Sequence, residues 1–172
     1  MSIDAYVLGV DPGLHCGFAL LRMHDASRVI SGMWRLHPRV GDGDGARFVR
    51  LHDHLDATLQ THPTIVSVAY EVPGELRRRD GGRASPATYL GLYGLVAHVE
   101  SWAERRQLHY CGFAPQQVKR AAGCSGNAPK ADVVAAIVSR YAIDLSDDNE
   151  CDAIAIACAG VARIHEQKAS IA

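Results

Sequence analysis

The tripeptide Asp11-Pro12-Gly13 stands between two apolar runs, residues 6–10 before it and residues 16–21 after it. Short apolar runs of this kind are typical of buried strands, and Pro-Gly is typical of a tight turn. The pattern therefore predicts a hairpin whose first strand ends in a carboxylate. A carboxylate in that position is costly to desolvate unless a cation lies nearby, and a divalent metal ion is the simplest such cation.

Two further acidic residues stand at the boundaries of apolar segments. Glu71 follows the apolar run 65–70, and Asp152 opens an apolar helix near the C-terminus. If the strands that end in Asp11 and Glu71 are neighbours, the final helix can deliver Asp152 to the same point. Carboxylates without histidine or cysteine partners suit Mg²⁺ or Mn²⁺ rather than zinc, and two such ions can hydrolyse a phosphodiester.

Each acid also has a purely structural interpretation. Asp11 can start a turn, Glu71 can pair with the arginines that follow it, and Asp152 can interact with a helix dipole. The metal-site hypothesis rests on the three together, because each acid interrupts an apolar run at the end of a different element.

The overall composition excludes few functions, whereas the sequence shows where the basic residues cluster. The chain has 172 residues, 48% apolar and 22% charged, which predicts one globular domain over residues 1–172. The formal net charge of -1 favours neither nucleic acid nor membrane, so any DNA contact must come from local clusters of cations. Such clusters are present at Arg77, Arg78, Arg79, Arg83, Lys119, Arg120 and Lys130.

The cysteines and the N-terminus bear on localisation. None of the five cysteines forms a CxxC pair, and four lie in apolar stretches, which favours free thiols in a reducing compartment. No apolar run of about 18 residues is present, nor an apolar N-terminal segment after a basic start. We therefore expect a cytoplasmic protein without a membrane partner.

The order of the predicted elements is that of an α/β fold with a mixed five-stranded sheet flanked by helices. Strands are predicted at 5–10, 16–22, 28–36, 64–70 and 108–113, the first three as an antiparallel meander. Helices are predicted around 48–59 and at 87–106, 115–122, 130–141 and 148–166. Ser146 or Asp147 is the predicted N-cap of the last helix.

Four blocks of the sequence resemble the RuvC-like Holliday junction resolvases, in their phage or prophage variant. They are Val-Leu-Gly-Val-Asp-Pro-Gly at 7–13, Tyr-Glu at 70–71, the segment 115–130, and Asp-Asp-Asn-Glu-Cys-Asp-Ala-Ile-Ala at 147–155. The blocks follow the family's order over about residues 7–160. The resemblance implies a ribonuclease H-like fold, a homodimer, and Mg²⁺-dependent paired nicking of four-way DNA junctions.

The resemblance also implies roles for single residues. Asp11 bridges two metal ions, and Glu71 and Asp152 each bind one. Lys119 and Lys130 lie near the scissile phosphate, where an ammonium group can neutralise charge that builds up in the transition state. The alternative is that both lysines are solvated charges at helix ends.

One departure from the family pattern is Asn149, three residues before Asp152, where the family commonly has an acid. Positions i and i+3 share a helix face, so the amide oxygen of Asn149 is predicted to be an auxiliary metal ligand. Asp148 is then expected to cap the helix. The alternative is that Asp148 supplies the ligand.

A second departure follows Glu71, where chromosomal relatives carry an aromatic side chain that can stack at the junction centre. Here the stretch contains Arg77, Arg78, Arg79 and Arg83 instead. Arginines can contact DNA phosphates or stack on bases, and the alternative is a solvated basic loop.

The helix at 87–106 carries the small residues Gly91, Gly94 and Ala97 close to one face. In this family the corresponding helix forms the dimer interface, and symmetric cutting of a two-fold junction needs two sites related by a two-fold axis. The alternative is that the glycines only pack the helix on its own sheet. The histidines receive little weight, because the one close pair, His52 and His54, diverges on a helix.

The sequence therefore predicts a dimeric, Mg²⁺-dependent endonuclease that resolves branched DNA, with Mn²⁺ as a possible substitute. Two alternatives share the fold: a junction-binding protein whose catalysis is impaired by Asn149, and a nuclease that acts on branched or structured RNA. An actin-like kinase is disfavoured, because no second phosphate-binding glycine motif follows the first.

Overall fold

The protein is built on one five-stranded sheet with the strand order β3-β2-β1-β4-β5. The computed structural model describes residues 4–25, 28–74, 85–143 and 147–170. Strands β1 (Tyr6–Asp11), β2 (His15–Arg22) and β3 (Val29–Arg35) form an antiparallel meander. Strands β4 (Ile65–Glu71) and β5 (His109–Phe113) join it in parallel. The predicted α/β class with a mixed five-stranded sheet is confirmed.

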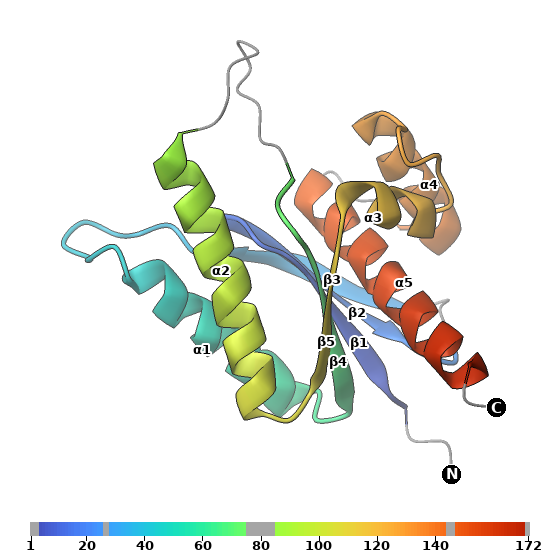
Figure 1. Cartoon of the computed structure of the whole chain (residues 1–172), viewed down its shortest axis with the longest axis horizontal. Coiled ribbons are helices and arrows are strands. Elements are labelled where there is room, and N and C mark those ends of the chain that lie inside the picture. Colours follow the sequence, from blue (N-terminus) through green and yellow to red (C-terminus); the bar gives the residue numbers. More distant parts are fainter. Residues whose placement is uncertain (1–3, 26–27, 75–84, 144–146, 171–172) are drawn as a thin grey trace.

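Helices cover both faces of the sheet (Figure 1). Helices α1 (Ala46–Thr61) and α2 (Pro86–Arg105) lie on one face, and α5 (Asp148–Ala169) crosses the other, with α3 (Pro115–Ala121) and α4 (Lys130–Tyr141) beside it. Each layer has its own apolar core, because strand residues alternate between the two faces. Trp34 and Trp102 are buried in the core on the α1 and α2 side.

Helix α5 begins where the sequence predicts and runs three residues further. Its N-cap is Asp147, whose carboxylate accepts a hydrogen bond from the backbone N–H of Asn149. The idea that Asp148 caps the helix is therefore wrong: Asp148 is the first helical residue, and its side chain points elsewhere.

Two strand glycines allow α5 to lie directly on the sheet. A Cβ atom on Gly9 would stand 2.3 Å from the carbonyl oxygen of Ala153, and one on Gly17 would stand 2.0 Å from that of Asn149. Neither distance is sterically possible, so only glycine at both positions permits this close approach. As a result, the first turns of α5 lie against the ends of β1 and β2.

The glycines of α2 pack inside the chain. A Cβ atom on Gly94 would stand 2.9 Å from the ring of Phe48, and one on Gly91 would stand 3.3 Å from the guanidinium of Arg47. Both neighbours belong to α1, so these two glycines make room for α1, and the expectation that they admit a partner helix stays a prediction. The alternative, packing on the sheet, is inexact, because the glycines accommodate α1 instead. Ala97 is exposed.

All five cysteines are free thiols, and Cys111 and Cys124 are only half-buried. Among the helices that the structure describes, none combines the length and apolarity that crossing a bilayer requires.

Candidate metal centre

Asp11, Glu71 and Asp152 converge at one edge of the sheet. Strands β1 and β4 are adjacent and parallel, with Val10 paired to Tyr70, so the next residues, Asp11 and Glu71, stand side by side at the carboxyl ends of their strands. Gly9 faces α5, and Asp11, two residues on, faces the same way. The first turns of α5 bring Asp152 to this point.

The pKa shifts of the three acids reflect their burial and their proximity to one another. Burial, followed by repulsion from Asp152 and Glu71, raises the pKa of Asp11 to about 7. Burial and then repulsion from Asp152 also raise the pKa of Glu71 to about 7. Burial raises the pKa of Asp152 as well, although its hydrogen bond with Lys130 opposes the shift. Three partly buried carboxylates thus face one another with an unmet demand for positive charge.

Lys130 provides part of that positive charge. Its ammonium Nζ lies 3.1 Å from Oδ2 of Asp152 and 3.5 Å from Oδ2 of Asp148. These acids are four residues apart on α5, so their side chains share one helix face. Asp148 therefore belongs to the acidic site. The sequence favours Asn149 as the additional metal ligand at this site and offers Asp148 only as the alternative.

Asn149 is directed away from this face. Its side-chain amide donates to Oδ1 of Asp147 at 2.9 Å, and its backbone N–H donates to the same oxygen at 2.8 Å. The role of Asn149 as a metal ligand stays a prediction, and in this structure its amide is occupied in the helix cap.

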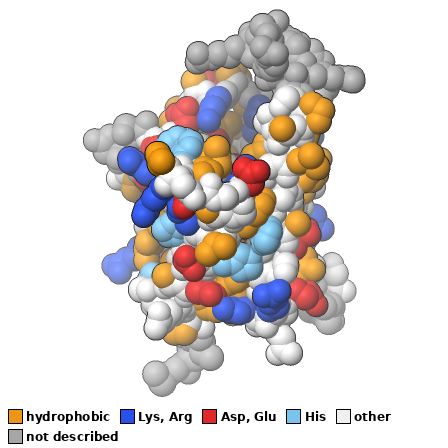
Figure 2. Space-filling model, turned by 90° about the vertical axis from the view of Figure 1, so that its left-hand side faces the viewer, with side chains coloured by type: hydrophobic (Ala, Val, Ile, Leu, Met, Phe, Trp, Pro, Cys, Tyr) orange, Lys and Arg blue, Asp and Glu red, His pale blue; other side chains and the backbone are white. Residues whose placement is uncertain are grey.

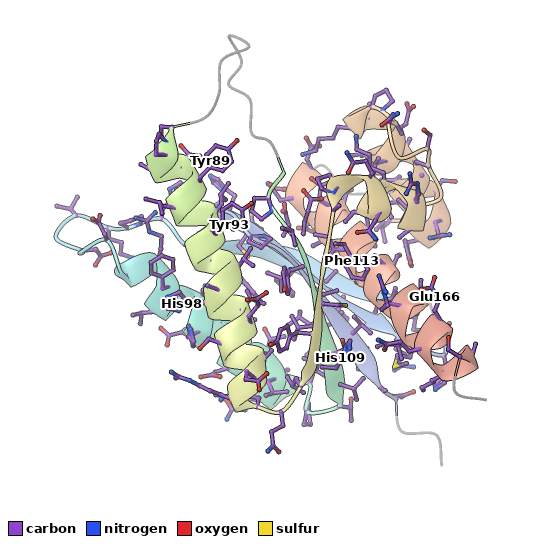
Figure 3. All side chains as sticks on the ribbon, viewed as in Figure 1. Tyr89, Tyr93, His98, His109, Phe113 and Glu166 are labelled. Carbon is purple, nitrogen blue, oxygen red and sulfur yellow. The ribbon has the colours of Figure 1, made fainter. Side chains whose placement is uncertain are left out.

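Lys119 lies beside the acids on α3. Its ammonium donates to the carbonyl oxygen of Ala128 at 2.7 Å and opposes the rise in the pKa of Glu71 that burial causes. A cavity of about 220 Å³ connects these groups and is lined by Glu71, Pro115, Val118, Lys119, Lys130, Val133 and Asp152. A second hollow, of about 640 Å³, opens over Asp11 and Glu71 between α2 and α3. Phe113, at the end of β5, closes the core between the sheet and α5 (Figure 3).

The residues fit hard divalent cations by their chemistry. Carboxylate oxygens are the ligands of Mg²⁺ and Mn²⁺, and Asp11, Glu71, Asp152 and Asp148 supply them. Within residues 4–25, 28–74, 85–143 and 147–170, no three acidic, histidine or cysteine side chains stand close enough to hold an ion as they are oriented here. The ammonium of Lys130 contacts oxygens of Asp148 and Asp152 for which a metal ion would compete.

Sequence reasoning missed two histidine pairs. The Nε2 atoms of His15 and His37 lie 3.0 Å apart, and Nε2 of His52 lies 3.0 Å from Nδ1 of His98. The members of each pair are 22 and 46 residues apart in the chain, so no local spacing could reveal them. Figure 2 shows histidine side chains gathered on the face that carries α1. The predicted DNA contacts Arg77, Arg78, Arg79 and Arg83 lie outside the described residues.

The fold has close counterparts among solved structures. RuvC from Thermus thermophilus superimposes with a TM-score of 0.70 at 20% identity, over 93% of this chain and 96% of that one. The chain has the ribonuclease H-like fold of RuvC. The T. thermophilus RuvC structure in complex with a Holliday junction substrate gives a TM-score of 0.72 at the same identity and coverage.

A third RuvC-like structure, the yeast mitochondrial Holliday junction resolvase Ydc2, gives a TM-score of 0.63 at 17% identity, over 96% of this chain and 81% of that one. No family model matches the sequence, and the curated proteins contain no similar one. The resemblance to RuvC seen in four short sequence blocks is thus confirmed at the level of the fold.

Proposed function

We propose that this protein is a divalent-metal-dependent endonuclease that resolves four-way and other branched DNA by paired nicking. The observation that carries the proposal is the meeting of Asp11, Glu71 and Asp152 at one edge of a RuvC fold, with raised pKa values that mark a demand for cations. A T. thermophilus neighbour of the same fold is a complex with Holliday junction substrate, which supports branched DNA as the substrate class.

The acidic residues would bind the metal ions, and the lysines would contact the DNA phosphates. Asp11, Glu71 and Asp152 would hold Mg²⁺ or Mn²⁺, with Asp148 as the fourth carboxylate. When bound, two such ions activate a water molecule and stabilise the leaving oxygen of the phosphodiester. Lys130 would leave Asp152 as a metal binds and turn to the scissile phosphate. Lys119, already fixed by Ala128, would hold the adjoining backbone.

A homodimer would place two such sites on a two-fold junction. The solvent-exposed surface of α2 carries Leu90, 75% exposed, and Tyr93, 47% exposed, with exposed Ala97 next along the same stripe. These residues recur at spacings of three and four, which is the pattern of a helix-packing face. We assign the dimer contact to this stripe rather than to Gly91 and Gly94.

The decisive test is cleavage of a synthetic four-way junction by the wild type beside Asp11→Asn, Asp148→Asn and Asn149→Asp. We expect symmetric nicks with Mg²⁺ or Mn²⁺ and none in EDTA, with cutting lost in Asp11→Asn. Asp148→Asn should raise the Mg²⁺ concentration for half-maximal cutting roughly tenfold. Asn149→Asp should cut as well as wild type or better. Equal cutting by wild type and Asp11→Asn would disprove the site assignment.

The second candidate is a junction-binding protein with weak catalysis. It is favoured by one observation: Lys130 already neutralises Asp152 and Asp148, and Asn149 is turned into the helix cap. Tight junction binding without nicks in either metal would select this candidate. A matched RNA four-way junction in the same assay tests the RNA alternative, which preferential RNA cutting would establish.

A further inference from the structure

A second polar cluster lies beside the acids, at the same edge of the sheet. Asp11 pairs in register with Gly17 on β2, and His15 stands two residues from Gly17, so His15 faces the α5 side as Asp11 does. Arg35 on β3 is paired directly with His15. Neighbouring strands lie about 4.8 Å apart and a strand rises about 3.4 Å per residue, so His15 and Arg35, two residues beyond the level of Asp11, lie roughly 8 and 12 Å from the end of β1.

The cluster is held in place by its surroundings. The backbone N–H of Leu36 donates to the carbonyl oxygen of Leu14 at 2.9 Å, which ties the end of β3 to the start of β2. Arg50 donates to the carbonyl oxygen of His37 at 3.2 Å. The positions of His15 and His37 are thus fixed by backbone contacts, and their mutual hydrogen bond is not needed to hold the two segments together.

The imidazole pair must present a free N–H group outward. Only one of two neutral rings can donate between the Nε2 atoms, so the accepting ring carries its proton on Nδ1. Among the described residues, neither Nδ1 atom has a hydrogen-bond partner, and the guanidinium of Arg35 has no ion pair. His15, His37 and Arg35 are all exposed. The carboxylate of Asp147 is near enough to interact with His15, and its Oδ1 accepts from the backbone and side-chain amides of Asn149.

We propose that His15, His37 and Arg35 form a second phosphate-binding surface, which holds the DNA backbone on the side of the acids opposite to Lys119 and Lys130. This inference rests on the proposed nuclease function. Lys119 and Lys130 stand on the α3 and α4 side of the site, and the histidine cluster stands on the β2 and β3 side. On each DNA strand phosphates recur about every 3.4 Å of helix axis, so a backbone crossing the acids meets donors before and after the cut.

The test measures binding of a fluorescent four-way junction in EDTA, where no cutting occurs. The variants are Arg35→Ala and the double variant His15→Ala with His37→Ala. Their matched controls are Arg105→Ala and His165→Ala, exposed residues near the C-terminal ends of α2 and α5, far from the sheet edge that carries the acids. Arg35→Ala should reduce the slope of log K against log salt by about 1. The double variant should bind about tenfold more weakly.

A further readout separates DNA contact from a structural role. His37→Arg combined with His15→Ala should regain much of the affinity that the double alanine variant loses, whereas a loss caused by altered structure would not be regained. Wild-type affinity in both variants would overturn the inference while leaving the nuclease proposal intact. A wild type that binds no DNA would overturn both.

Discussion

At the scale of single residues, the acids of the site weaken the fold that holds them. The pKa of Asp11 is about 7 in the folded protein, against an ordinary 3.8. A raised folded pKa means that the unfolded chain releases this proton more readily. The free energy of unfolding therefore falls as pH rises from about 4 to about 7. Function requires the charge that folding disfavours.

Asp11→Asn removes this ionisation and should stabilise the protein. We expect the free energy of unfolding to rise by up to about 4 kcal/mol at about pH 8, given the shift from 3.8 to about 7. Near pH 4 the variant and the wild type should be equally stable. Urea denaturation in EDTA at both pH values measures this. Asp53→Asn, on the exposed side of α1, is the control, and an unstabilised Asp11→Asn at pH 8 would contradict the burial argument.

The carboxylates Asp11, Glu71 and Asp152 could be predicted at this scale because each interrupts an apolar run. Which of Asp148 and Asn149 faces the acids could not be predicted, because it depends on a one-residue shift in the helix cap. Asp147 accepts from Asn149, which turns that amide away and leaves Asp148 toward Lys130. Spacing along the helix alone is compatible with either residue as the additional ligand.

At the scale of elements, the sequence predicts the strands and helices to within a few residues, because β-strand runs and helical periodicity are local patterns. What it cannot show is which element covers a given face. Gly94 is a plain example: its missing side chain makes room for Phe48 of α1, and only the packed structure reveals that neighbour.

The glycines under α5 offer a sharp test of element packing. Gly9→Ala would force its methyl group to 2.3 Å from the carbonyl oxygen of Ala153, so α5 must shift. We expect a loss of about 3 kcal/mol in the free energy of unfolding and a loss of cutting. Gly43→Ala, with open space around it, should change stability by less than about 0.5 kcal/mol. Unchanged stability in Gly9→Ala would show that α5 is not held at this distance.

The contact between α1 and α2 should weaken in acid. His98 stacks on Phe48 and shares a hydrogen bond with His52 between these helices (Figure 3). Burial and then His98 lower the pKa of His52, with Arg105 and Arg106 adding to the shift and Asp56 opposing it. A lowered folded pKa means that stability is complete above about pH 6.5 and is lost as the pH falls below it.

Thermal melts at about pH 7.5 and pH 5 can measure this effect. Between about pH 7.5 and pH 5, the melting temperature of the wild type should fall by more than that of His52→Gln, because the paired imidazoles cannot both be charged without repulsion. His165→Gln, at the far end of α5, should follow the wild type at both pH values. A parallel response of His52→Gln and wild type would exclude the pair as a source of acid sensitivity.

At the scale of the whole molecule, the proposed dimer provides the remaining prediction. Replacing Leu90 and Tyr93 together by glutamate places two charges in the exposed stripe of α2. We expect dissociation to monomers in sedimentation, with the melting temperature changed little and junction cutting reduced to unpaired nicks. Val49→Glu, an exposed apolar position of α1, should leave the dimer intact. A monomeric wild type would refute the stripe as an interface.

The close packing of α5 against β1 affects which size of ion the proposed site accepts. The backbone contact at Gly9 fixes how far apart Asp11 and Asp152 can stand, and Mg²⁺ and Ca²⁺ differ in the length of their bonds to oxygen by about 0.4 Å. Discrimination between a small and a large cation would then depend on Gly9 and Gly17, whose missing methyl groups let α5 approach the sheet, rather than on the oxygens that touch the ion.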